Sequence, residues 1–202
     1  MKNTNKQKAI LRIAGFIAII AMIVFSFTSC GSLNDLLFGR SDGPTYKIGD
    51  RGPGGGIVFY DHGNNAHGWR YFEVSPENLG EAFWAIQNSP GIRTISGARG
   101  VAIGTGKENT AAILAADPTA PAAKLCVEYR GGGLDDWFLP SRDELNEIYK
   151  QRRVLNITAG TFWSSSQGPT PANAWLHVFS NDNRNPGYKD YMANNIRAVR
   201  SF

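Results

Sequence analysis

Residues 135–149, DDWFLPSRDELNEIY, carry the clearest local-structure signals in the 202-residue chain. Ser141 followed by Glu144 forms a capping box, in which the Ser side chain accepts the third helical N–H and the Glu side chain accepts the N–H of the cap residue. A helix is therefore predicted to begin after Ser141. Apolar residues then recur at i, i+3 and i+4 and would face a core: Leu145, Ile148 and Tyr149. A short apolar strand, residues 137–139, precedes the helix through a Pro-Ser corner.

Two further helices are predicted upstream of this stretch. Thr105 and Glu108 form a second possible capping box, which would open a helix over residues 109–116. Another helix would follow Pro121 and end at the glycine triplet of residues 131–133, where a left-handed residue is readily accommodated. The apolar stripe of that helix is Ala122, Leu125, Cys126 and Tyr129. The thiol in this stripe is expected to be a small buried side chain and not an activated nucleophile.

Strands are predicted towards both ends of the region from residue 46 to residue 202. Aromatic and period-2 patterns indicate strands at residues 57–60, 69–74, 161–166, 174–179 and 196–200. The segment 75–106 is rich in Gly, Asn, Ser and Pro and is expected to form loops and short strands, and the Asn-rich segment 180–186 is expected to form a loop. Central helices flanked by strands indicate an α+β domain with mixed antiparallel sheets, about two to three helices and long loops, whose first and last strands could pair.

The charge distribution argues against binding to nucleic acid. The formal net charge is +4, but four of the 21 basic residues and none of the 17 acidic ones lie before position 30. Residues 31–202 therefore carry 17 charges of each sign. Binding to a phosphate backbone needs clustered positive charge, and the sequence contains no such run.

The N-terminal segment has the features of a signal peptide. A basic, polar start precedes an uncharged apolar run, residues 13–28, which is shorter than the about 20 residues that a spanning helix needs. The tetrad before and including Cys30, Phe-Thr-Ser-Cys, resembles a bacterial lipobox. The resemblance implies that residues 1–29 are removed, that the Cys30 thiol is acylated, and that residues 30–45 tether the domain to a membrane. Gly31 after the cysteine favours the outer membrane or cell surface over the inner membrane, with a periplasm-facing anchor as the alternative; an ordinary signal peptide with a coincidental cysteine remains open.

Several patterns that could support catalysis or metal binding are incomplete. Residues 104–107, GTGK, lack the spacing of a phosphate-binding P-loop. The three histidines, His62, His67 and His177, match no zinc spacing, and the serines at 164–166 lack a nucleophile elbow. Asp182, with the asparagines around it, offers oxygen ligands of the kind that Ca²⁺ takes, but without EF-hand spacing. We therefore expect no cofactor, with calcium as the alternative.

The last forty residues concentrate aromatic and polar side chains of the kind found on recognition surfaces. The candidate ligand-binding residues are Trp175, His177, Asn181, Asn183, Arg184, Asn185, Tyr188, Tyr191 and Asn194, with Lys189 and Asn195 beside them. The alternative is that Trp175 and Phe179 are core residues and that the asparagines only form turns. The sequence leaves both interpretations open.

An ordered set of motifs resembles the C-terminal domain family of the Legionella collagen-like protein, a domain of unknown function. The motifs span residues 46–202: YKIGD, GPGGGIVFYD, GWRY, AIGTGKENTAAI, DDWFLPSRDEL, FWSSS, AW with a following FS, and IRAVR. The family is similar in outline to C-type-lectin-like and formylglycine-generating-enzyme-like folds. The resemblance implies a binding domain whose variable residues lie between positions 167 and 195. Formylglycine-generating relatives use paired cysteines, and calcium-binding lectins carry a WND-type motif, so both activities are disfavoured here.

These observations predict a lipid-anchored envelope or surface protein that binds a host or envelope glycan or protein non-covalently, as an adhesin or a diversified receptor. It is not expected to be an enzyme. The alternatives are a structural or assembly lipoprotein of the envelope and an enzyme without a recognisable site.

The lipid anchor can be tested directly. Cells that express the full chain should incorporate radioactive palmitate into it, and Cys30→Ala should abolish the incorporation because no acyl-accepting thiol remains at the cleavage site. Cys126→Ala is the matched control and should label like the wild type. Equal labelling of the wild type and Cys30→Ala would refute the anchor.

Overall fold

The computed structural model describes residues 43–202, and Tyr46–Phe202 forms one compact unit. The expected signal peptide, Cys30 and most of the tether lie outside the described residues. Among residues 43–202, no helix has the length and apolarity needed to cross a membrane.

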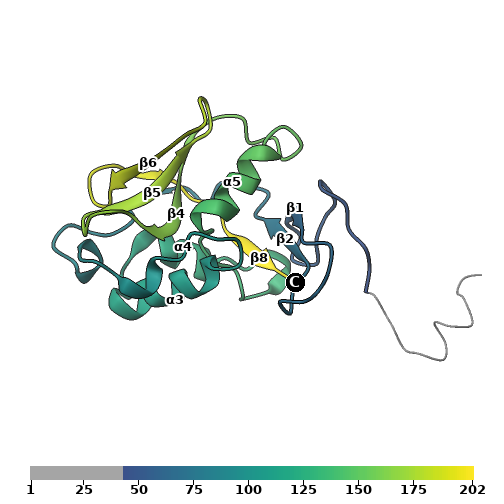
Figure 1. The fold of residues 1–202 in the computed structure, drawn as a ribbon, viewed down its shortest axis with the longest axis horizontal. Coiled ribbons are helices and arrows are strands. Elements are labelled where there is room, and N and C mark those ends of the chain that lie inside the picture. Colours follow the sequence, from purple (N-terminus) through teal and green to yellow (C-terminus); the bar gives the residue numbers. More distant parts are fainter. Residues whose placement is uncertain (1–42) are drawn as a thin grey trace, which may run out of the picture. The chain divides into compact units, whose positions relative to one another are not determined.

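The described residues form an α+β structure with three α-helices and two sheets, as the sequence predicts (Figure 1). The helices are α3 (Gly106–Ala116), α4 (Pro121–Glu128) and α5 (Arg142–Lys150). The strands are β1 (Ile57–Asp61), β2 (Tyr71–Val74), β3 (Glu81–Ala82), β4 (Thr161–Gln167), β5 (Asn173–Val178), β6 (Asn183–Tyr188), β7 (Asn194–Asn195) and β8 (Val199–Ser201). Single turns of 3₁₀ helix lie at Pro90–Ile92, Ser96–Ala98 and Gly131–Gly133.

The smaller sheet joins the two ends of the compact unit. Its order is β1-β2-β8. The predicted pairing of the first and last strands is therefore wrong, because β8 pairs with β2. The ring of Tyr46 packs edge-on against Phe202, with centroids 5.2 Å apart, and against Tyr71 at 5.3 Å. The predicted strand at residues 137–139 is reduced to one bridge, in which Phe138 and Val199 exchange two backbone hydrogen bonds of 2.9 Å.

The larger sheet has the order β3-β7-β4-β5-β6 and is antiparallel except for one parallel contact between β4 and β7. Figure 1 shows α3 and α4 below this sheet and α5 between it and the smaller sheet. Helix α5 contacts β4 and β5 of the larger sheet and β1 of the smaller one.

Sequence reasoning missed the strand β6. Residues 180–186 had been expected to form a loop, but Asn183–Tyr188 pairs along its whole length with β5. A strand that is exposed at nearly every position shows no apolar alternation, so its backbone pairing cannot be read from side chains. Asp182 has a φ of +60° in the connecting turn, a conformation that Asp tolerates better than most residues do.

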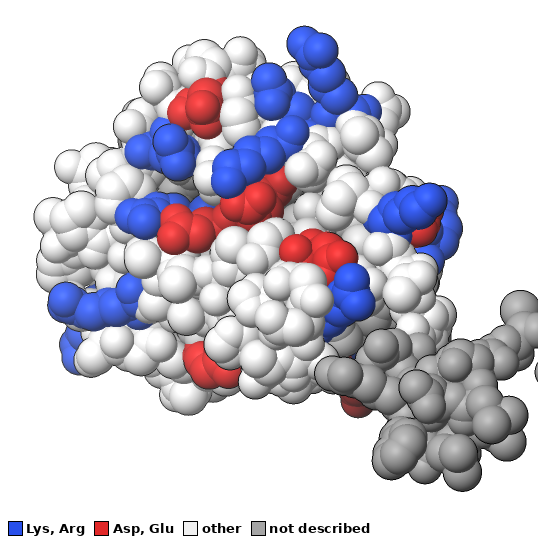
Figure 2. All heavy atoms as spheres, turned by 45° about the vertical axis from the view of Figure 1, so that its right-hand side comes forward, with Lys and Arg blue, Asp and Glu red and all other residues white. Residues whose placement is uncertain are grey.

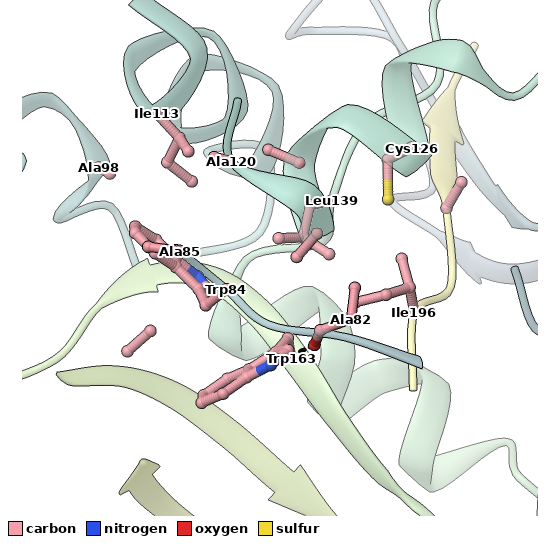
Figure 3. Packing of buried hydrophobic residues seen from close by; sticks show 14 of the residues in the cluster. Ala82, Trp84, Ala85, Ala98, Ile113, Ala120, Cys126, Leu139, Trp163 and Ile196 are labelled. Carbon is pink, nitrogen blue, oxygen red and sulfur yellow. Dashed lines mark hydrogen bonds between the residues drawn. The ribbon is translucent and has the colours of Figure 1, made fainter. Parts of the chain in front are cut away.

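Two apolar clusters fill the interior. The first lies between the larger sheet and helices α3 and α4 and includes Trp84, Ile113, Cys126 and Trp163 (Figure 3). The second joins α5 to both sheets through residues such as Phe72, Leu145, Ile148 and Phe162. Cys126 is fully buried, as predicted, and this burial raises the pKa of its thiol.

The predicted capping box at the start of α5 is confirmed. The backbone N–H of Glu144 donates to Ser141 Oγ (3.2 Å), and the N–H of Ser141 donates to Glu144 Oε2 (2.7 Å). The apolar stripe behaves as expected at Leu145 and Ile148, which are buried, whereas Tyr149 is half-buried.

The same carboxylate also caps a second helix. The N–H groups of Gly104 and Gly106, at the start of α3, donate to Glu144 Oε1 at 2.8 and 3.2 Å. The predicted capping box of Thr105 and Glu108 is therefore wrong: the Thr105 hydroxyl donates to Ala102 O (2.7 Å) and makes no cap bond. The side chain of Glu144, from a distant part of the chain, caps α3 in place of Thr105, and sequence spacing cannot reveal such a contact.

A second buried carboxylate holds the other glycine-rich loop. Glu73 on β2 is fully buried, and its two oxygens accept the N–H groups of Gly54 (2.9 Å) and Gly56 (2.8 Å). Arg200 on β8 donates to Glu73 Oε1 at 3.0 Å and also pairs with Asp136. A Cβ on Gly52 would lie 2.5 Å from Glu73 Oε2, so the glycines let the loop wrap closely around the carboxylate.

Burial raises the pKa of Glu144 from 4.5 to about 7, against the lowering effect of the three backbone N–H donors. A raised folded-state pKa means that the folded protein binds this proton more tightly than the unfolded chain does. The group's contribution to stability is therefore fully present below pH 4.5 and is lost as pH rises through 7. Linkage over these values gives a change of about 3 kcal/mol.

Urea unfolding of the wild type and Glu144→Gln between pH 4 and 8.5 tests this dependence. The free energy of unfolding of the wild type should fall relative to that of the variant as pH rises from 4.5 to 7, because Gln does not titrate. The comparison removes the contributions of histidines and of other carboxylates. Parallel pH profiles for the two proteins would contradict the assignment.

Candidate functional site

The nine candidate binding residues lie on and beside the β5–β6 hairpin, but they do not form one surface. Side chains alternate across paired strands, so residues separated by two positions share a face. In the observed register Trp175 lies opposite Pro186 and His177 opposite Arg184, so these residues share the face towards α5. Asn183 and Asn185 belong to the opposite face.

Trp175 and His177 are covered by α5. The guanidinium of Arg142 lies over the Trp175 ring at 5.3 Å, and the Tyr149 ring lies 4.6 Å from that of His177. His177 is only 2% exposed. Both residues therefore join the sheet to the helix that the capping box begins.

His177 also fastens the β5–β6 turn. Its Nε2 lies 2.9 Å from Asp182 Oδ1, while its Nδ1 is buried without a partner in the described structure. Burial lowers the pKa of His177, although Asp182 opposes this effect. The neutral imidazole can therefore donate from Nε2 to the carboxylate, which fixes the turn.

Lys189 and Asn194 also point inwards. Lys189 is fully buried, and its ammonium donates to Gly91 O (2.9 Å), Arg93 O (3.0 Å) and Gln167 Oε1 (2.7 Å). Desolvation lowers the pKa of Lys189 to about 8. This side chain anchors the segment between β6 and β7 to the body of the domain.

Six candidate residues remain exposed: Asn181, Asn183, Arg184, Asn185, Tyr188 and Tyr191. Tyr188 is 63% exposed and Tyr191 is 77% exposed, with Met192 at 58% beside them. The N–H of Tyr191 approaches Tyr188 O at 3.4 Å, so the two tyrosines flank one turn around the buried Lys189. We call residues 188–191 the tyrosine turn.

The serines of the FWSSS motif are buried and serve the fold. Ser164 Oγ donates to Trp175 O (2.8 Å) and Ser166 Oγ donates to Gly100 O (2.7 Å). Ser165 Oγ accepts from Asn109 Nδ2 at 3.2 Å. All three residues are fully buried, so none is accessible to a substrate in this structure.

A hollow lies between the β1–β2 loop and the first turn of α3. It consists of two adjoining cavities of about 360 and 300 Å³. The residues that line both are His67, Trp69, Gly104 and Glu108. We call this region the aromatic hollow. The candidate residues from the last forty positions do not line it.

Aromatic rings pack on one another along the wall of the aromatic hollow. His67 stacks on Trp69 with centroids 5.4 Å apart, and His62 meets both rings edge-on at 4.9 and 5.4 Å. Trp69 in turn packs against the buried Phe72 at 4.7 Å. The wall is thus fixed to the core of the domain.

From the sequence, His62 and His67 were candidates for metal or base chemistry, without the spacing of a zinc site. Within residues 43–202, no group of three or more His, Cys, Asp or Glu side chains is placed to hold a metal ion. The Asp182 carboxylate faces His177 and, at 3.9 Å, Arg184. The closeness of His67 and Trp69 in the sequence is a signal that could have indicated an aromatic surface. The opposite wall of the aromatic hollow comes from residues 103–108, which only the fold brings there.

Positive and negative side chains are interspersed on the face seen in Figure 2. This agrees with the balanced charge of residues 31–202.

In comparisons with known proteins, no protein-family model and no curated protein sequence matches the chain.

Proposed function

We propose that this chain is a lipid-anchored protein of the outer membrane or cell surface whose domain, residues 46–202, binds a glycan or protein ligand without catalysis. The binding surface is the exposed part of the β5–β6 hairpin together with the tyrosine turn. In this proposal the domain is a C-type-lectin-like domain of the family that its motifs resemble.

The observation that carries the proposal is the exposure of Tyr188 and Tyr191 on an anchored turn. Exposed aromatic side chains offer a large contact area with few rotatable bonds, and such residues are enriched at recognition sites. Lys189 fixes the backbone between the two tyrosines through three hydrogen bonds. Binding to a fixed turn loses less conformational entropy than binding to a mobile one.

The exposed polar residues extend this surface along β6. Arg184 is on the same face of β6 as Tyr188 and supplies donors on that side, whereas the exposed Asn183 and Asn185 supply donors and acceptors on the other side of the strand. The inward placement of His177 and Asn194 removes them from direct contact with a ligand and gives them a supporting role.

The full chain, purified in detergent, can be tested on glycan and protein arrays. A variant that combines Arg184→Ala, Tyr188→Ala and Tyr191→Ala should lose at least about thirtyfold in affinity for the ligand found, which corresponds to about 2 kcal/mol from residues at the centre of an interface. Since all three side chains are exposed, the thermal midpoint should change little.

The matched control replaces two exposed apolar residues elsewhere, Phe83→Ala and Ile86→Ala, and should bind like the wild type. If the wild type binds nothing above background, or if the triple variant binds normally, the proposed surface is wrong. Loss of folding in the triple variant would show that these residues belong to the core. Binding confined to proteins of the cell's own envelope would favour an assembly role.

A further inference from the structure

The rings in the wall of the aromatic hollow pack on one another, and one of them packs on the core. Trp69 is held against Phe72, which is fully buried, and His67 stacks on the same indole. Tyr60 lines the hollow beside them, and its hydroxyl lies 3.4 Å from His62 Nδ1. Preformed walls of aromatic rings are typical of small-molecule sites, and both cavities lie at the lower end of the size range of such sites.

Gly104 allows the two walls to meet. It has a φ of +93°, and a Cβ at this position would lie 3.0 Å from the Trp69 ring. The backbone of the loop before α3 therefore passes close to the indole at the place where the two walls meet. The glycine is required both by its conformation and by this close approach.

The polar groups around the aromatic hollow favour an uncharged ligand. The N–H groups of Gly104 and Gly106 are already bound by Glu144, so the start of α3 offers them to no external anion. The charged groups on the lining are Glu108 and Lys107, which oppose each other in sign. A ligand with a net charge would gain little from this balance.

The remaining polar atoms suit hydroxyl groups. The Glu108 carboxylate accepts hydrogen bonds, and the Thr105 hydroxyl, which donates to Ala102 O, still has a free lone pair. The hydroxyl of Tyr60 and the ring nitrogens of the histidines can both donate and accept. A sugar ring presents an apolar C–H face to aromatic rings and hydroxyl groups to its sides, and so matches both kinds of group.

We propose that the aromatic hollow binds the ring of an uncharged sugar. The proposed function also allows a glycan ligand, but this site is a different one, because the hollow contains none of the residues of the tyrosine turn. The domain then carries two separate recognition sites.

Fluorescence anisotropy of the full chain in detergent tests the sugar site. The probes are labelled maltotriose, cellotriose, N,N′,N″-triacetylchitotriose and lactose, with 3′-sialyllactose as the charged counterpart of lactose. At least one neutral probe should bind, and sialyllactose should bind no better than lactose. His67→Ala and Trp69→Ala should each weaken binding about tenfold, the change produced by losing about 1.4 kcal/mol.

Phe83→Ala is the control, because it removes an exposed aromatic ring outside both the hollow and the tyrosine turn and should leave sugar binding unchanged. His67 is exposed, so its variant tests the site even if Trp69→Ala fails to fold. Absence of binding by every neutral probe, stronger binding of sialyllactose than of lactose, or normal binding by a folded His67→Ala would overturn the proposal. If every neutral probe fails while a ligand found on the arrays binds through the tyrosine turn, the sugar site is refuted and the proposed function stays intact.

Discussion

Two buried carboxylates, those of Glu144 and Glu73, organise the structure around them. Each accepts N–H groups from two glycines of a loop: Gly104 and Gly106 for Glu144, and Gly54 and Gly56 for Glu73. A buried carboxylate is costly unless hydrogen bonds replace the lost water, and backbone N–H groups in a glycine-rich turn can approach closely enough to do so. The two loops resemble phosphate-binding loops in composition, but their anion is part of the protein.

This arrangement links elements that are distant in sequence. Glu144 joins the start of α5 to the start of α3, and Glu73 joins β2 to the loop before β1. Arg200 extends the second contact to β8 and Asp136. Because Glu144 holds the loop before α3 from inside, the outer surface of this loop is free to line the aromatic hollow.

The sequence was most informative where structure is set by neighbouring residues. The capping box at Ser141 and the buried stripe of α5 depend on residues within one or two turns, and both are confirmed. The predicted cap of α3 was wrong because Glu144 caps this helix from a distant position in the sequence. The strand β6 was missed because its pairing with β5 involves the backbone alone. The candidate binding residues separate into buried and exposed ones for a similar reason. Only the fold places α5 over His177 and leaves Tyr191 exposed.

Hydrogen exchange at the four glycine amides tests the central claim most directly. If internal carboxylates hold both loops, the amides of Gly54, Gly56, Gly104 and Gly106 should exchange only through global unfolding. The amide of Gly63 donates to the exposed Asp61, so it should exchange far faster and serves as the internal reference. Exchange of the four amides at the rate of Gly63 would contradict the account.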